Sequence, residues 1–377
     1  MRLLRALSLL AAASMPLASM QASPQAVDHA GEAVAKLNHA LDALSDADRV
    51  SSAVSMAWET QGKQYWLNQG PTPSQPMEFE LRQRQHSDFE AGLTYVAFDF
   101  SGPESLFQRA TVLRHSDRSE DLLELLALSP IAVARQLATR PADLRLLTGS
   151  DDGAVIAGPL MDRLVELELD AQGLPRALSY VFEDDLLGDS TRRIEYLDYW
   201  QQDGWNVPRR VRQLDGGRLV RDAAVAGFAV DRALPGWAEG LQPRQAHPPD
   251  SPTGFAAERI AAGIYHLKQH GGSDYHGLGV ELRDGWMVLE TPLAIGDGTA
   301  LREALAAISP RPIVYAAATH HHDDHAAGMA AFRSDGVTVL TTSGNVAYFE
   351  TMMAASRDFS RLAAKARVVA QIGRAHV

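Results

Sequence analysis

The stretch at residues 319–325, THHHDDH, places four potential metal ligands within six positions. The apolar run before it, residues 312–318 (PIVYAAA), is typical of a buried strand. Small helix-forming residues follow at 326–332 (AAGMAAF). The sequence therefore predicts a strand-to-helix turn that carries the pattern His-x-His-x-Asp-His, in which the ligand types are His320, His322, Asp324 and His325.

The residue types in this pattern favour metal binding. In an extended or turning backbone, side chains two positions apart can converge on one ion, and Asp324 and His325 then project toward a neighbouring position. Imidazole nitrogen and carboxylate oxygen are ligands that zinc accepts, as iron and manganese do less selectively. The alternative is a solvated histidine-rich loop. We favour the metal site, because four such groups crowded together repel one another as they protonate.

The motif resembles the signature of the metallo-β-lactamase superfamily, and the similarity extends over residues 260–364. Residues 285–292 (GWMVLETP) look like the family's second strand, and residues 337–345 (VTVLTTSGN) resemble the strand and loop after the motif helix. The resemblance implies an αββα sandwich, a cleft at the sheet edges and, in most members, hydrolase activity.

The same resemblance implies one or two metal ions, with zinc expected and iron or manganese as alternatives. His320 and His322 would then hold one metal, and Asp324 and His325 would hold the second. Asp324 would also act as the catalytic residue that orients or deprotonates the attacking water. A bound dication lowers the pKa of a coordinated water to about 7 and polarises the bond to be broken.

Further side chains are candidates for the surroundings of the metal. Glu290 stands where many relatives carry Asp, so the resemblance implies that it accepts the second N–H of a histidine ligand. The loop at 269–277 (QHGGSDYHG) corresponds to one that borders the family's cleft. Its polar side chains could contact substrate, or the segment could be a plain turn; the candidates are His270, Asp274, Tyr275 and His276.

The length of chain after the motif departs from the family pattern. Only 52 residues follow His325 (377 − 325), whereas the family's remaining ligands and the closing half of its sandwich need more. The one later histidine, His376, lies in residues 372–377 (IGRAHV), which look like a translated sequencing adapter. We therefore expect an incomplete metallohydrolase domain over 255–371 and a non-native tail over 372–377.

Composition narrows the function classes. With 377 residues the chain is long enough for two domains, and 46% hydrophobic residues is ordinary for globular protein. A net charge of −12 without a basic stripe argues against a nucleic-acid partner. Cysteine is absent from the sequence, which excludes disulfides, thiolate zinc ligands and a cysteine nucleophile within it.

The first 22 residues resemble a secretory signal peptide. Arg2 and Arg5 give the charged start, residues 6–17 are largely apolar, and Ala22 offers a cleavage position. The apolar run is too short for a membrane helix, so we expect no stable membrane span. The expected location is the periplasm or the extracellular space.

The region at 24–245 predicts a helix followed by antiparallel strands. Apolar residues at steps of three and four predict an amphipathic helix that begins near Pro24 and ends near Leu44. Alternation between turn residues predicts strands at 52–58, 77–85, 93–100, 164–169, 175–183, 191–200 and 206–214, and short helices at 119–128 and 131–139. Such a region should form a curved sheet around the first helix.

This region also resembles, at the level of pattern, the half-barrel of bacterial lipoprotein carriers. The similarity lies in residues 169–175 (LDAQGLP) and 196–208. It implies a concave surface that could bind an apolar or lipid-like ligand. A proline-bearing linker over 246–254 then leads to strands expected at 261–267, 278–282 and 286–290 and a helix expected at 299–308.

Together these patterns predict an α+β protein: an N-terminal antiparallel curved sheet with helices, then the first half of an αββα metallo-β-lactamase sandwich. The expected function is a metal-dependent hydrolase that uses activated water on an ester, lactone, thioester, amide or related bond of a small molecule. The alternative is a periplasmic ligand-binding or carrier protein with a vestigial or incomplete metal domain. The sequence selects neither the substrate nor the oligomeric state.

Overall fold

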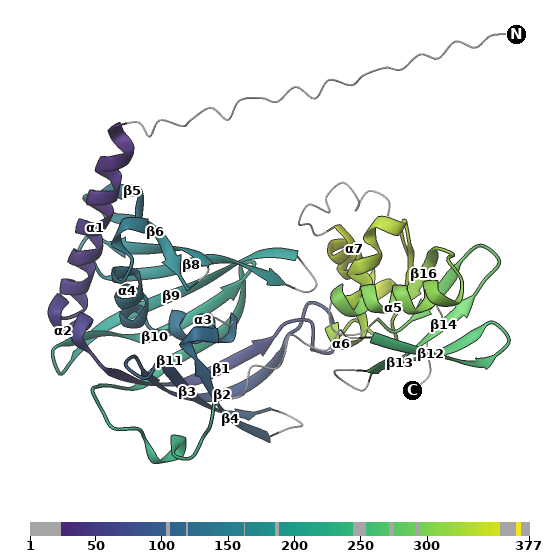
Figure 1. The fold of residues 1–377 in the computed structure, drawn as a ribbon, viewed down its shortest axis with the longest axis horizontal. Helices are drawn as coiled ribbons and strands as arrows, with labels where there is room; N and C mark the ends of the chain where they lie inside the picture. Colours follow the sequence, from purple (N-terminus) through teal and green to yellow (C-terminus); the bar gives the residue numbers. More distant parts are fainter. Residues whose placement is uncertain are drawn as a thin grey trace, which may run out of the picture.

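The computed structural model describes residues 24–102, 106–117, 120–161, 163–184, 188–243, 254–270, 275–291, 295–354 and 367–370. Two sheets organise these residues, an antiparallel sheet of eleven strands and a mixed sheet of seven (Figure 1). The expected α+β class and the large curved antiparallel sheet are confirmed. We refer to residues 24–243 as the N-terminal region and to residues 254–370 as the C-terminal region.

The first sheet has the strand order β4-β3-β2-β1-β11-β10-β9-β8-β7-β6-β5. The first strand therefore pairs with the last, and the rest of the sheet extends on both sides of that pair. Its strands are β1 (Ser55–Trp66), β2 (Met77–Asp88), β3 (Leu93–Ser101), β4 (Leu106–Arg114), β5 (Arg145–Ser150), β6 (Gly153–Leu160), β7 (Arg163–Asp170), β8 (Pro175–Asp184), β9 (Gly188–Gln202), β10 (Trp205–Asp215) and β11 (Arg218–Val230).

Among the described residues, four α-helices accompany this sheet: α1 (Pro24–Leu44), α2 (Ala47–Ser52), α3 (Glu120–Ala127) and α4 (Pro130–Ala138). The apolar face of α1, with Leu37 and Leu44, is buried and packs toward α4, β5, β6 and β10. Ser129 caps α4 by accepting from the backbone N–H of Ala132, so the break expected before Pro130 is a helix start.

Two buried polar clusters lie among the inward-facing residues of this sheet. The guanidinium of Arg192 donates to both carboxylate oxygens of Asp215, at 2.8 and 2.7 Å, and to Glu124 at 2.6 Å. Arg221, 4% exposed, donates to the side-chain oxygens of Gln64 and Gln83. These partners are what buried guanidinium groups need, because an unpaired buried charge is costly.

The second sheet has the order β12-β13-β14-β15-β16-β17-β18, antiparallel as far as β15 and parallel beyond it. Its strands are β12 (Gly254–Ala261), β13 (Ile264–His270), β14 (His276–Glu281), β15 (Trp286–Leu289), β16 (Ile313–Ala317), β17 (Thr338–Thr341) and β18 (Arg367–Ala370). Its helices are α5 (Ile295–Ile308), α6 (Asp323–Ala326) and α7 (Val346–Ala354). Trp286, Phe332 and Phe349 fill the core between sheet and helices.

Several local expectations were wrong. The single strand expected at 261–267 is instead a hairpin, because Gly263 turns the chain with φ +70° between β12 and β13. The helix expected at 326–332 is a 3-10 helix, Ala327–Asp335. Gly254, expected in the linker, already belongs to β12. Strands β4, β5, β6 and β11 were not predicted from the sequence.

Some expectations fall outside the described residues. These are the signal segment at 1–22, the rest of the linker at 246–253, Asp274 and the tail at 372–377. Within the described part of the chain, none of the helices combines the length and apolar character that crossing a membrane requires.

Candidate metal centre

The motif lies on a tight turn between β16 and α6. Thr291, fully buried after β15, fastens this turn, because its backbone N–H donates to the carbonyl of His325 at 2.9 Å and its carbonyl accepts from Gly328 at 2.9 Å. Two aspartates, Asp323 and Asp324, begin α6, and the side chain of Asp323 accepts from the backbone N–H of Asp324 at 3.0 Å. The backbone around the motif is therefore anchored from the neighbouring strand.

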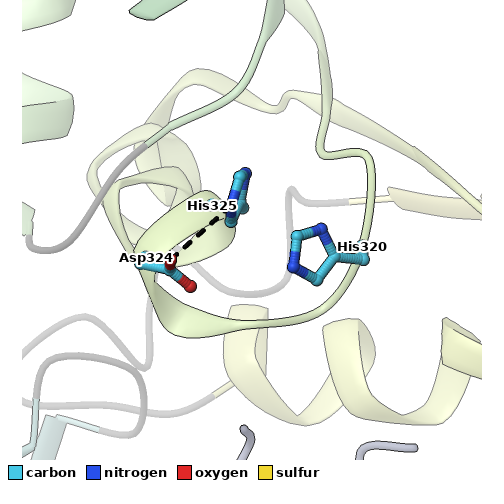
Figure 2. Close-up of side chains that lie close together, drawn as sticks. All are labelled: His320, Asp324 and His325. Atoms are coloured by element: carbon cyan, nitrogen blue, oxygen red, sulfur yellow. Dashed lines mark ion pairs between the residues drawn. The ribbon is translucent and has the colours of Figure 1, made fainter. Parts of the chain in front are cut away.

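Three of the four expected ligands converge. His320, Asp324 and His325 each offer one ligand atom, and these atoms all lie within 4.8 Å of one another. Figure 2 shows the ring of His320, from the loop, facing the two side chains from α6. The ring centroids of His320 and His325 are 4.1 Å apart, and His325 Nε2 lies 3.6 Å from Asp324 Oδ2.

His322 is close to this group but is not part of it. Its ring centroid lies 4.4 Å from that of His320, while its Nε2–H donates to the carbonyl of Gly70 in the N-terminal region at 3.1 Å. That bond leaves Nδ1 as the nitrogen with a lone pair. His321, 5% exposed, is not one of the three converging residues and packs edge-on against Tyr348.

Glu290 contacts both the motif loop and a motif ring. Its carboxylate accepts from the backbone N–H of Thr319 at 2.7 Å and from His325 Nδ1 at 2.5 Å. The second bond fixes the tautomer in which His325 Nε2 carries the lone pair. Glu290 adopts φ +66°, a left-handed backbone that costs a non-glycine residue about 1 kcal/mol. The fold thus holds this carboxylate in place at a cost in backbone strain.

The electrostatics of the turn favour neutral imidazoles. Burial lowers the pKa of His320, and the neighbouring His325 and His322 lower it further. Burial likewise lowers the pKa of His321, with His322 and His320 adding to the effect. Burial raises the pKa of Asp323, and the charge of Asp324 contributes. A neutral imidazole is the form that binds a metal.

Of the loop residues expected near the site, one lies near a candidate ligand and two are exposed on strands. Burial raises the pKa of the Tyr275 phenol, and the charge of the neighbouring Asp324 carboxylate raises it further. His276 is exposed and stacks on His266, with His266 Nε2 and His276 Nδ1 2.7 Å apart. His270 is exposed at the end of β13.

Two cavities border the motif. One, of about 510 Å³, lies along the sheet and is lined by Glu290, Thr319 and His276 among others. The other, of about 600 Å³, is lined by residues of both regions and reaches Asp323 and Asp324. Beside the second cavity, Gln69 contacts Asp324 and Gly70 contacts His322. These two residues carried no sequence signal, because they precede the motif by about 250 residues.

Comparison with known proteins gives limited similarity. No protein-family model matches the chain. No curated protein matches it either. Among solved structures, a Cronobacter sakazakii metallo-β-lactamase with a HARLDQ motif is 20% identical over 26% of this chain and 38% of its own, with a TM-score of 0.23. A Pseudomonas aeruginosa metallo-β-lactamase in its mono-zinc form is 26% identical over 27% and 47%, with a TM-score of 0.24.

A third similar structure belongs to a different protein superfamily. A LolA superfamily protein from Nitrosomonas europaea is 12% identical over 55% of this chain and 95% of its own, with a TM-score of 0.30. The chain spans less than half the length of the metallo-β-lactamases it matches. TM-scores this low establish neither the fold nor the activity of this chain.

Proposed function

We propose that the chain binds a divalent cation at His320, Asp324 and His325 and belongs to a metal-dependent hydrolase. The observation that carries the proposal is the convergence of three ligand atoms within 4.8 Å of one another on a turn anchored from the next strand. His322 would join them through Nδ1, since its Nε2 is engaged by Gly70. Zinc is the proposed ion, with iron or manganese as alternatives.

The donor set fits such an ion. In two of the three rings, one nitrogen is engaged by an acceptor of the protein, which leaves the other for a metal: Glu290 engages His325 and Gly70 engages His322. In the third ring, Nδ1 of His320 shares a hydrogen bond with the Thr319 hydroxyl at 3.0 Å. Such partners orient ligating histidines and select their tautomer.

The residues of the chain would divide the work. A bound dication would supply Lewis acidity and make a water reactive near neutral pH. Asp324 would hold that water or take its proton, since its carboxylate lies at the junction of His325, Tyr275 and the cavity between the regions. Glu290 would keep the ring of His325 in position and in the tautomer that leaves the lone pair on Nε2.

The reaction that we propose is hydrolysis of an ester, lactone, thioester, amide or related bond of a small molecule. We further propose that the C-terminal region is the first half of an αββα metallo-β-lactamase sandwich, on the support of the motif and of its place between β16 and α6. Export to the periplasm or beyond, directed by residues 1–22, completes the proposal.

Metal content tests this function. Protein purified without chelator is expected to carry zinc, iron or manganese, measured by plasma mass spectrometry, and to hydrolyse at least one member of an ester, lactone, thioester and amide panel. The double variant His320→Ala/His325→Ala should lose the metal, whereas His266→Ala, which removes a half-buried histidine outside the group, should leave it bound. Equal metal content in both variants would refute the site, and would favour the ligand-carrier alternative.

A further inference from the structure

The cavity between the two regions joins the proposed metal group to the N-terminal sheet. It measures about 600 Å³ and is lined by the end of β1 and the residues after it, by inward-facing residues of β8 to β11, and by Asp323 and Asp324 of the motif. In Figure 1 the connected ends of β1 and β2 reach α6, which carries these aspartates. A molecule reacting at Asp324 would therefore extend into this space.

The loop between β1 and β2 is built to form one wall. Its Gln69 amide donates to Asp324 Oδ1 at 3.5 Å, and its Gly70 carbonyl accepts from His322. Any side chain at position 70 would place its Cβ 1.8 Å from the carbonyl oxygen of Gln75, so the loop needs glycine there. The N-terminal region thus contacts the motif through a specific loop conformation.

The charges of the lining oppose an anion. Arg192 is the one basic side chain among the described lining residues, and its guanidinium is already engaged by Asp215 and Glu124. Three further carboxylates belong to the lining: Asp184, Asp323 and Asp324. Among the described lining residues, an anionic group would meet four carboxylates, including that of Asp215, and one guanidinium that already binds Asp215 and Glu124.

The remaining lining suits a ring. Tyr65, Trp66 and Phe182 all border the cavity. Phe182 is fixed beneath the guanidinium of Arg192, 4.3 Å from its ring centroid, and Trp66 packs on Phe79 at 4.5 Å while staying 37% exposed. Pre-positioned aromatic faces bind planar apolar groups at low entropic cost, and nearby amides such as that of Gln64 supply hydrogen bonds to neutral polar atoms.

We propose that this cavity binds the non-reacting part of the substrate, and that this part is an uncharged, ring-bearing group. The word substrate rests on the proposed hydrolase function, but the binding itself does not require a metal. The N-terminal region is then a specificity element of the site, because it contributes the rings and the loop wall.

Two fluorescent probes that differ in one sulfonate test the proposal on the full chain treated with EDTA. The uncharged N-phenyl-1-naphthylamine is expected to bind. The sulfonated 1-anilinonaphthalene-8-sulfonate is expected to bind about tenfold more weakly or worse, because of the carboxylates. Removing one of them with Asp184→Asn should narrow the difference between the probes. Equal affinities for the two probes in the unmodified protein, or no binding of the uncharged probe, would overturn the proposal.

Variants locate the bound probe. Phe182→Ala removes a ring from the wall and should weaken the uncharged probe by about tenfold. Val220→Phe instead fills the cavity and should exclude the probe even if Phe182→Ala fails to fold. Leu278→Ser, in the other cavity, is the control and should leave binding unchanged. Loss of binding in the control but not in the two cavity variants would overturn the assignment.

Because the assay omits metal, its result is independent of the proposed chemistry. A chain that binds the probe but carries no metal when it is purified without chelator would refute the hydrolase proposal and leave the cavity proposal standing. Metal retention without probe binding would do the reverse. The two proposals therefore fail separately.

Discussion

Replacing Glu290 by Gln tests how the fold holds the proposed metal group. The carboxylate accepts two hydrogen bonds, from Thr319 N–H at 2.7 Å and from His325 Nδ1 at 2.5 Å. A glutamine of the same length has one acceptor oxygen and one NH2 group, so it can accept only one of these bonds with that geometry. The backbone stays at φ +66° in both forms, so backbone strain does not distinguish them.

The expected loss is large because the bond to His325 is charge-assisted. Removing the partner of a ligating histidine weakens metal affinity about 10- to 100-fold. That range corresponds to about 1.4 to 2.7 kcal/mol. The expected loss for Glu290→Gln lies in this range, since the ring of His325 loses both its orientation and a negative neighbour.

Competition of the protein with a chromophoric zinc chelator at pH 7.5 measures this affinity. Glu281→Gln is the matched control, because Glu281 lies on the adjacent β14 and pairs with Arg311 at the surface. The control should stay within twofold of the unmodified protein. Zinc affinity of Glu290→Gln within twofold of the unmodified protein, or an equal loss in the control, would refute the reasoning.

Four further outcomes follow from the structure. Arg192→Met leaves the buried carboxylate of Asp215 without its guanidinium partner and should cost about 3 to 5 kcal/mol in urea unfolding, whereas Arg210→Met at the surface should cost less than about 1 kcal/mol. Gly298→Ala places a Cβ 1.9 Å from the carbonyl oxygen of Gly328, so both the urea midpoint and zinc affinity should fall. Zinc at a hundredfold excess over its dissociation constant should raise the free energy of unfolding by about 2.7 kcal/mol, seen as a higher melting temperature. Burial lowers the pKa of the His86 imidazole in the folded chain, so the unfolded chain binds a proton there more readily as the pH falls below about 6.5. The free energy of unfolding then falls by at most about 1.4 kcal/mol per pH unit. His86→Gln should therefore reduce the pH dependence of the urea midpoint between pH 5 and 7.5.

Strands with a clear alternation could be predicted from the sequence, whereas strands made of small residues could not. β7 reads LVELEL, and its inward residues Val165, Leu167 and Leu169 are buried as the alternation requires. β11 contains AAVAGFAV, whose alanines favour a helix locally. β11 pairs with β1, the strand of this region that is farthest from it along the sequence, and this pairing overrides the helical preference.

The candidate site likewise has one part that could be predicted from the sequence and one part that could not. His320, Asp324 and His325 lie within six positions, so their spacing and one turn suffice to predict that they converge. The contact of His322 with Gly70 joins residues 252 positions apart. No local pattern encodes it, because it depends on how the loop after β1 meets α6.

The motif and the cavity draw their residues from different regions of the chain. The ligand atoms lie on α6 and on the loop before it, and their nearest partner, Glu290, directly follows β15, so the proposed chemistry resides within the C-terminal region. The rings and the loop wall of the cavity come from the N-terminal region. Exchanging the N-terminal region in a relative that keeps the motif should therefore change which molecules are bound while leaving the metal group in place, since selectivity and reactivity are carried by separate parts of the chain.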